Sequence, residues 1–123
     1  MKFSIITVCF NSESTIRDTL DSVLMQTWKE LEIVVIDGNS QDSTCKIVEA
    51  YGDDRIKLIS EKDQGIYFAM NKGYENSSGE VIGFLNSDDF FAHSKVLEQY
   101  AEEFILGNDC CFGDIEYVTN ESR

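Results

Sequence analysis

The sequence predicts an α/β protein built on a mostly parallel sheet of five strands flanked by helices, in a Rossmann-like arrangement. Short apolar runs rich in β-branched residues alternate along the chain with segments whose apolar residues recur at helical spacing. Polar turn residues separate each run from the segment after it. An alternation of strand and helix calls for parallel strands joined by right-handed crossovers.

The first part of the chain is predicted to form two strands and the helix between them. Phe3–Phe10 is β-branched, nearly continuous in apolar character and free of charge, as expected of a buried strand. Asn11 and Ser12 follow it and are good candidates to cap the next helix. Glu32–Ile36 is the second strand. The helix between the strands has its apolar face at Ile16, Leu20, Val23 and Leu24.

The middle of the chain is predicted to form two helices around a third strand, Ile56–Ile59. The helix before this strand ends at Gly52 and the helix after it ends near Gly79. Apolar residues at helical spacing mark the earlier helix at Ile47, Val48 and Tyr51, and the later one at Ile66, Met70 and Tyr74.

The last part of the chain is predicted to add two strands. Val81–Leu85 holds five residues without a charge, which favours a strand that is covered on both faces. Ser94 can cap a further helix, and Cys110–Val118 is the fifth strand. The apolar face of that helix consists of Leu97, Tyr100, Ala101, Phe104 and Ile105.

Length and charge narrow the functional classes. The 123 residues suit a single domain, 1–123, and no apolar run approaches the roughly 20 residues of a membrane span. The start of the chain lacks the pattern of a signal peptide, so we expect a cytoplasmic protein, either free or at the cytoplasmic face of the membrane. The balance of 10 basic and 23 acidic residues, −13 overall, argues against nucleic acid as a partner. The four cysteines form no Cys-x-x-Cys and lie apart from His93, which argues against a zinc site.

Polar side chains gather where the predicted strands end. In a parallel sheet these ends share one edge, so we expect a common site there. Carboxylates suit a hard cation such as Mg²⁺ or Mn²⁺, and no glycine-rich phosphate loop is present to bind a phosphate without one. Taken alone, the acidic pair could also be a solvated loop that starts the next helix. The residues are Thr7, Asn11, Asp37, Asp63, Asp88 and Asp89.

Four segments resemble, in order and spacing, the N-terminal half of family 2 glycosyltransferases with the GT-A fold. They are Thr7-Val-Cys-Phe-Asn11, Glu32-Ile-Val-Val-Ile-Asp-Gly-Asn-Ser-Gln-Asp-Ser-Thr44, Asp63-Gln-Gly-Ile-Tyr-Phe-Ala-Met-Asn-Lys-Gly73 and Gly79-Glu-Val-Ile-Gly-Phe-Leu-Asn-Ser-Asp-Asp89. The resemblance implies an inverting transferase that uses a nucleotide-sugar donor, most often a UDP-sugar, with Mg²⁺ or Mn²⁺. It implies a glycan or lipid-linked acceptor and a place in polysaccharide or glycoconjugate synthesis.

The resemblance also implies roles for single residues. Thr7 and Asn11 match positions in a first loop beside the nucleotide, Asp37 matches the acid that contacts the base, and Asp63 matches a position near the nucleotide. Asp88 matches a ligand of ribose or metal, and Asp89 a ligand of the metal. Two positions depart from the family pattern: Phe68 replaces a frequent acid and Gln64 a frequent basic residue.

The sequence assigns no catalytic base. Family members normally supply it from a later, acceptor-binding portion, which we expect to be absent from this chain. His93 is interpreted as a solvated neighbour of a helix cap, and Asp114 and Glu116 as one polar face of a strand. The chain is therefore predicted to be the donor-binding part of a glycosyltransferase.

Two other functions are compatible with parts of the pattern. A catalytically incomplete fragment could bind nucleotide or serve in protein contacts, and apolar surface left uncovered would then drive homo-oligomerisation. A phosphoreceiver domain also gathers acids at one sheet edge. It requires an acidic pair after the first strand and a lysine after the last, whereas this chain has Asn11 and Ser12 at the first place and no lysine after Lys95.

Overall fold

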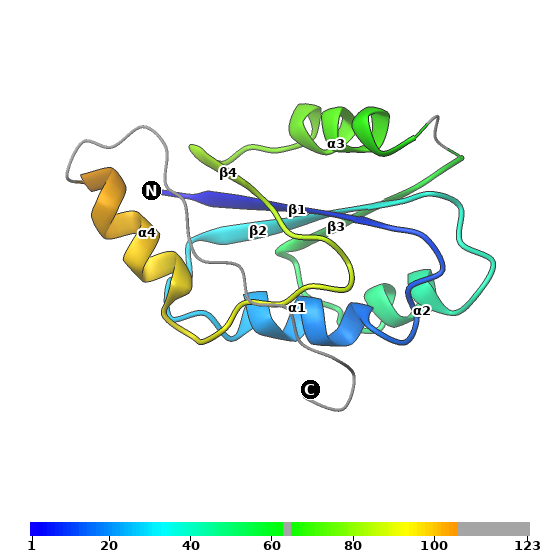
Figure 1. Ribbon diagram of the computed structural model, residues 1–123, viewed down its shortest axis with the longest axis horizontal. Helices are drawn as coiled ribbons and strands as arrows, with labels where there is room; N and C mark the ends of the chain where they lie inside the picture. Colours follow the sequence, from blue (N-terminus) through cyan, green and yellow to red (C-terminus); the bar gives the residue numbers. More distant parts are fainter. Residues whose placement is uncertain (63–64, 106–123) are drawn as a thin grey trace.

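The computed structural model describes residues 1–62 and 65–105, which form an α/β fold around a parallel sheet (Figure 1). Its strands are β1 (Phe3–Cys9), β2 (Leu31–Asp37), β3 (Ile56–Ser60) and β4 (Val81–Phe84), in the order β3-β2-β1-β4. Every pairing within the described sheet is parallel. The predicted fold class is therefore confirmed. The strand predicted at Cys110–Val118 lies outside the described residues.

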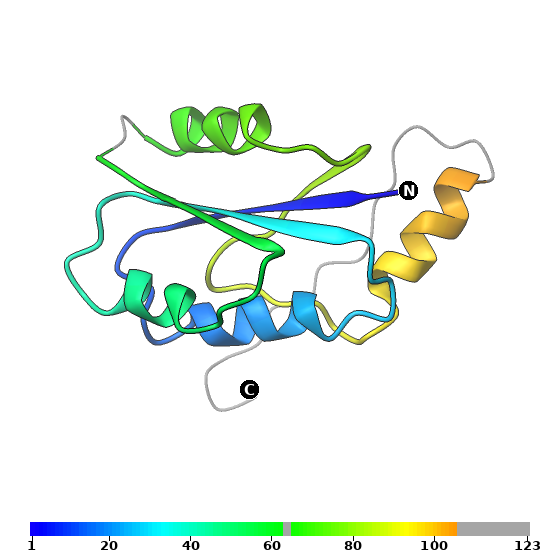
Figure 2. The ribbon, with the colours of Figure 1, turned by 180° about the vertical axis from the view of Figure 1, so that it is seen from behind.

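Helices cover both faces of the sheet. α1 (Ile16–Leu24) and α2 (Thr44–Glu49) lie on one face and α3 (Ile66–Glu75) on the other, in both views of the molecule (Figures 1 and 2). α4 (Val96–Ile105) lies beside the start of β1. None of these four helices of the described part is long and apolar enough to cross a membrane.

The core follows the alternation of side chains along β1 and β2. Phe3 and Ile5 face α1 and α2, while Ile6 faces α3. The larger cluster, on the side of α1, comprises Phe3, Ile5, Cys9, Ile16, Leu20, Val23, Leu31, Ile33, Val35, Ile47, Val48, Leu97 and Ala101. The smaller one, under α3, comprises Ile6, Val34, Ile36 and Ala69. The predicted apolar face of α1 is therefore confirmed.

The packing face of α3 differs from the predicted one. Ile66 and Tyr74 are 53% and 60% exposed, whereas Ala69 and Gly73 are buried. A Cβ on Gly73 would lie 2.4 Å from Cγ2 of Ile6. Small residues thus bring this helix close to the sheet, and the larger apolar residues lie outside the contact.

The strand β4 is less covered than predicted. Its residues are half-buried, and Phe84 at its end is 50% exposed. The sheet order explains the difference, because β4 is the outermost strand of the described sheet and pairs there only with β1. The prediction of a strand buried on both faces is therefore wrong for the described part of the chain.

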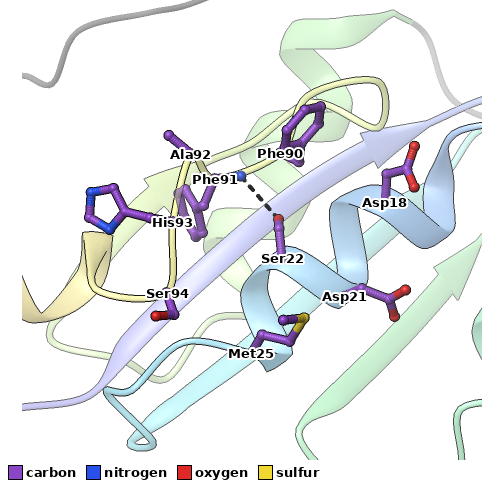
Figure 3. Close-up of a pocket in the computed structure, with 9 residues that line it drawn as sticks. All are labelled: Asp18, Asp21, Ser22, Met25, Phe90, Phe91, Ala92, His93 and Ser94. Atoms are coloured by element: carbon purple, nitrogen blue, oxygen red, sulfur yellow. Dashed lines mark hydrogen bonds between the residues drawn. The ribbon is translucent and has the colours of Figure 1, made fainter. Parts of the chain in front are cut away.

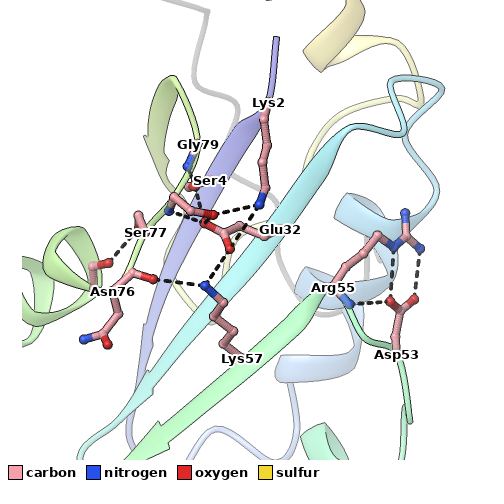
Figure 4. A network of polar contacts seen from close by, with 11 residues as sticks. Lys2, Ser4, Glu32, Asp53, Arg55, Lys57, Asn76, Ser77 and Gly79 are labelled. Atoms are coloured by element: carbon pink, nitrogen blue, oxygen red, sulfur yellow. Dashed lines mark hydrogen bonds and ion pairs between the residues drawn. The ribbon is translucent and has the colours of Figure 1, made fainter.

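A buried carboxylate forms hydrogen bonds and ion pairs across the amino-terminal edge of the sheet (Figure 4). Glu32 on β2 is 3% exposed. Its Oε2 accepts hydrogen bonds from Oγ of Ser4 at 2.5 Å and from the backbone N–H of Ser78 at 2.6 Å. Its Oε1 lies 2.9 Å from Nζ of Lys57 and 3.7 Å from Nζ of Lys2. One side chain thereby joins three strands to the turn between α3 and β4.

Candidate functional site

The register of the sheet brings three strand ends together at the carboxyl edge. Cys9 pairs with Asp37, and Asp37 pairs with Ser60, so the ends of β1, β2 and β3 lie side by side. The backbone N–H of Leu85 donates to the carbonyl of Ile6 at 3.0 Å, which carries the chain after β4 along β1 towards the same edge. The predicted gathering of strand ends is present in the fold.

Asp37, at the end of β2, accepts several hydrogen bonds at this edge of the sheet. Its side chain is fully buried, and it accepts hydrogen bonds from Ser40 (backbone N–H, 2.8 Å; Oγ, 2.5 Å), Oγ of Ser60 (2.8 Å) and Sγ of Cys9 (3.4 Å). Burial by itself raises the pKa of Asp37, but the hydrogen bonds from Ser40 and Ser60 outweigh it and lower the pKa below its usual value. The Asp37 carboxylate is therefore ionised, and its oxygens are occupied by hydrogen bonds from within the protein. Its predicted contact with a base stays a prediction.

The loop after β1 and the loop after β2 are linked by reciprocal hydrogen bonds. The backbone N–H of Asn11 donates to Oγ of Ser40 at 2.8 Å, and Oδ1 of Asn11 accepts from the backbone N–H of Gln41 at 2.8 Å. Asn11 itself has a φ of 48°, in the left-handed region that asparagine tolerates. Since Asn11 joins the loops and α1 begins only at Ile16, its predicted role as a helix cap is wrong.

Acidic side chains extend this linkage further along both loops. Oε2 of Glu13 accepts from the backbone N–H of Ser43 at 3.0 Å, and Oδ2 of Asp42 accepts from the backbone N–H of Glu13 at 3.2 Å. The backbone N–H of Ser12 donates to Oγ1 of Thr44 at 2.8 Å. The two loops therefore form one hydrogen-bonded unit at the carboxyl edge, which we call the loop pair (residues 10–15 and 38–43).

Thr7 lies beneath this unit. It belongs to β1, two residues before the strand ends, and its side chain is fully buried. Its hydroxyl has no hydrogen-bond partner among the described residues. The predicted position in the first loop is therefore wrong for Thr7, and a contact with the nucleotide stays a prediction.

The third loop is only partly described, since Asp63 and Gln64 lie outside the described residues. Beside it, Lys72 of α3 forms an ion pair with Glu61 and lies 4.9 Å from the centroid of the Phe68 ring. The Lys72 side chain is only 12% exposed. Phe68, one of the two departures from the family pattern, thus packs against a cation, an arrangement that is favourable on electrostatic grounds.

The acidic pair lies in a tight turn after β4. The backbone N–H of Asp89 donates to the carbonyl of Asn86 at 3.0 Å, while Asp88 is exposed and Asp89 half-buried. Oγ of Ser87 lies 2.9 Å from Oγ of Ser12 and shares a hydrogen bond with it. The fold therefore joins this acidic turn (residues 86–89) directly to the loop pair.

The donor set of the acidic turn fits a divalent cation bound together with a ligand. No group of three or more His, Cys, Asp or Glu side chains within residues 1–62 and 65–105 is arranged to hold a metal alone. Mg²⁺ is, however, commonly bound through one or two carboxylates plus the phosphates of a substrate. Asp88 and Asp89 supply such a pair of hard oxygen donors next to each other.

Polar side chains on helix α1 and just after its end bind the connection between β4 and α4, and the sequence did not single them out as part of the site. Oγ1 of Thr19 lies 2.9 Å from the carbonyl of Ser87 and 2.5 Å from that of Asp89. Nε2 of Gln26 donates to the carbonyl of His93 at 2.8 Å, and its Oε1 accepts from Leu97 at 3.0 Å. A signal was present for Thr19, because this polar residue shares the buried face of α1 with Leu20 and Val23.

A pocket of about 370 Å³ opens between α1 and this connection (Figure 3). Oγ of Ser22 accepts a hydrogen bond from the backbone N–H of Phe91 at 3.1 Å within it. Nδ1 of His93 accepts from the backbone N–H of Lys95 at 3.1 Å, in keeping with a residue that precedes a helix. The pocket is lined by Asp18, Asp21, Ser22, Met25, Phe90, Phe91, Ala92, His93 and Ser94.

Comparison with known sequences gives one consistent result. The model of the family described as Glycosyl transferase family 2 matches residues 4–123. The UDP-Glc:alpha-D-GlcNAc-diphosphoundecaprenol beta-1,3-glucosyltransferase WfgD of Escherichia coli is 37% identical over 122 residues, which cover 97% of this chain and 47% of that protein. The putative teichuronic acid biosynthesis glycosyltransferase TuaG of Bacillus subtilis is 34% identical over 117 residues, covering 93% of this chain and 46% of that protein. The chain thus spans less than half the length of these relatives.

Solved structures share the architecture. S. aureus TarS in complex with UDP-GlcNAc superposes with a TM-score of 0.75 at 34% identity, over 85% of this chain and 31% of that one. The mannosyltransferase PcManGT from Pyrobaculum calidifontis, in complex with GDP-Man and Mn²⁺, gives a TM-score of 0.77 at 23% identity, over 88% of this chain and 33% of that one. The second likeness concerns the fold alone. Both neighbours are glycosyltransferases with the GT-A fold, so the described sheet and helices form the corresponding part of that fold.

Proposed function

Because the chain belongs to glycosyl transferase family 2, we propose that it binds the nucleotide-sugar donor of an inverting glycosyltransferase at the carboxyl edge of its sheet. The observation that carries the proposal is the acidic turn, which lies after β4 and is joined to the loop pair by the contact between Ser12 and Ser87. In parallel α/β sheets this edge is where ligands bind. The donor proposed is a UDP-sugar, because S. aureus TarS, at 34% identity, was solved with UDP-GlcNAc.

A divalent cation, Mg²⁺ or Mn²⁺, is part of the proposal. A nucleoside diphosphate is an anion, and this chain carries a net charge of −13. Bound at Asp88 and Asp89, the cation would act as a Lewis acid that stabilises the departing diphosphate. The chain itself supplies the two carboxylates, the backbone turn that presents them and the loop pair beside them.

The side of the site that faces the base is proposed to include Phe10. Its ring follows β1 directly and is 59% exposed, next to Asn11 in the loop pair. An exposed aromatic ring can stack on any nucleobase. Asp37 is buried, so its proposed effect on base binding is indirect: its hydrogen bonds to Ser40 fix the conformation of residues 38–43. Asp63 is retained as a proposed neighbour of the nucleotide on the strength of the family motif alone.

The acceptor is proposed to be a glycan or a lipid-linked sugar, in the synthesis of a polysaccharide or glycoconjugate at the cytoplasmic side of the cell. The acceptor and the kind of synthesis follow the relatives, whose names specify GlcNAc-diphosphoundecaprenol and teichuronic acid biosynthesis. A catalytic base must lie within hydrogen-bond reach of the attacking hydroxyl of the acceptor. We place none of the described residues beside the acceptor, so we assign no base among them. The chain is proposed to bind the donor, with transfer requiring the acceptor-binding portion typical of the family.

Thermal unfolding with combinations of nucleotide and metal tests the proposal. UDP at about 100 times its Kd stabilises a folded protein by about 2.7 kcal/mol, which raises the Tm of a domain of this size by about 10 °C. We expect this rise with UDP plus Mn²⁺ or Mg²⁺, and not with UDP or metal alone. Asp89→Ala should abolish the rise. Asp54→Ala, which removes an exposed acid just before β3, at the opposite edge, should leave it unchanged.

The same experiment separates this function from its alternatives. A protein whose Tm is unaffected by UDP, GDP or CDP, with or without metal, would refute donor binding and leave a role in protein contacts. Light scattering would then show whether the chain forms homo-oligomers. Covalent phosphorylation by acetyl phosphate would instead establish a phosphoreceiver.

A further inference from the structure

We propose that Thr19 is a positioning residue of the donor site: from helix α1 it fixes the backbone on both sides of the pair Asp88 and Asp89. The inference rests on the proposed function, since it concerns the same metal–nucleotide site. Thr19 is fully buried and belongs to α1, far in sequence from the turn that it contacts.

Thr19 contacts the acidic turn through a single atom, its hydroxyl oxygen Oγ1. Oγ1 of Thr19 lies 2.5 Å from the carbonyl oxygen of Asp89, 2.9 Å from that of Ser87 and 3.5 Å from that of Asn86. The hydroxyl has one hydrogen to donate, so it bonds one carbonyl at a time, and the two short distances make Asp89 and Ser87 its alternative acceptors. The carbonyl of Ser87 belongs to the peptide group before Asp88, and that of Asp89 belongs to the peptide group after Asp89, so the two contacts bracket the acidic pair.

Further polar contacts with the same connection come from Ser22 on α1 and from Gln26 just after the helix. Oγ of Ser22 donates to the carbonyl of Thr19 at 2.7 Å. It also accepts from the backbone N–H of Phe91 at 3.1 Å, as Figure 3 shows. Gln26, also fully buried, binds the carbonyl of His93 and the N–H of Leu97. Residues 19, 22 and 26 therefore hold successive points of the connection from the acidic turn to α4.

The hydrogen bonds of Thr19 to the acidic turn should affect cation binding as well as the stability of the fold, because the turn carries two negative charges. Asp88 and Asp89 are neighbouring carboxylates, which repel each other until a cation lies between or in front of them. A free turn would relax to separate them, and the cation would then have to restore the binding geometry at a cost in affinity. Thr19 holds the backbone in place beforehand, which is what preorganisation of a binding site requires.

Titration of Mn²⁺ tests the inference directly. Thr19→Val keeps the shape of the side chain and removes the hydroxyl. In the presence of UDP, we expect it to raise the half-saturating concentration of Mn²⁺, followed by the electron paramagnetic resonance signal of free Mn²⁺, about tenfold, as for one lost hydrogen bond. Thr19→Ser retains the hydroxyl and should restore binding to within about twofold. Thr27→Val is the matched control, because its hydroxyl donates to Oε2 of Glu98 in the first turn of α4, at 2.7 Å, away from the acidic turn.

Each result bears on the inference. Wild-type Mn²⁺ binding by Thr19→Val would overturn it, as would equal weakening by Thr19→Ser or by Thr27→Val, which would point to packing or to general destabilisation. If Thr19→Val does not fold, Ser22→Ala takes its place, with an expected loss of about threefold and an unchanged affinity as the contrary result. A wild-type chain that binds no Mn²⁺ with UDP would overturn the proposed function itself, and the inference with it.

Discussion

Replacing Glu32 by glutamine should destabilise the fold in a pH-dependent way. Burial alone raises the pKa of Glu32, but hydrogen bonds from Ser4, Ser78 and Lys57 outweigh this effect and lower the pKa from 4.5 to about 2. At about 1.4 kcal/mol per pH unit, this difference corresponds to roughly 3 kcal/mol of stability in the ionised form. The figure agrees with the roughly 1.5–3 kcal/mol expected for hydrogen bonds to a charged group.

The sign of the pH dependence follows from the direction of the shift. Because the folded-state pKa of Glu32 is depressed, its contribution is complete above pH 4.5 and is lost as the pH falls towards 2. Glu32→Gln should therefore lower the free energy of unfolding by about 3 kcal/mol at pH 7, and the deficit should shrink steadily below pH 4.5. Urea unfolding of both proteins at pH 7, 4 and 3 measures this difference.

A second glutamate provides the control for this prediction. Glu30 lies close by, but its side chain is 60% exposed and forms an ion pair with the amino terminus at 3.4 Å. Glu30→Gln should change stability by less than about 0.5 kcal/mol at any of these pH values. If Glu32→Gln is as stable as the wild type at pH 7, or if its deficit is independent of pH, the role assigned to the charge of Glu32 is refuted.

Two further predictions concern α3 and the base. Gly73→Ala should destabilise the protein by about 2 kcal/mol in urea unfolding, because the added methyl would lie 2.4 Å from Cγ2 of Ile6; an unchanged midpoint would contradict the close packing of α3. Phe10→Ala should weaken UDP binding about tenfold in calorimetry, since stacking on a base contributes about 1–3 kcal/mol, while stability stays within about 0.5 kcal/mol. Met25→Ala, at an equally exposed residue (67%) away from the loop pair, should bind UDP normally, and equal binding by both variants would exclude a stacking role.

Much of the fold could be predicted because it depends on local patterns. The alternation of apolar runs and helical spacing is a property of neighbouring residues, and it placed β1, β2, β3 and all four described helices correctly. The face of α3 could not be predicted in this way. Hydrophobicity favours Ile66 and Tyr74 as core residues, whereas the available space under the helix selects Ala69 and Gly73.

The sequence predicted which residues gather at the candidate site, but not the long-range hydrogen bonds that hold them there. Strand ends are visible in a sequence, so the convergence of Asn11, Asp37 and the acidic turn on one edge followed from the fold class. The long-range hydrogen bonds join pairs such as Ser12 with Ser87 or Thr19 with Asp89, which lie 70 or more positions apart in the chain. Thr19 leaves a local signal, as a polar residue on the apolar face of α1, but no local pattern identifies the distant carbonyl that is its partner.

The loop pair has a consequence for altering this protein by design. Residues 10–15 and 38–43 are held by bonds that each loop gives to the other, including those of Asn11 with Ser40 and Gln41 and that of Glu13 with Ser43. A loop transplanted alone from a relative would bring only half of these donors and acceptors and would meet a partner shaped for another sequence. We therefore expect the two segments to keep their shape only when both are transferred together as one unit.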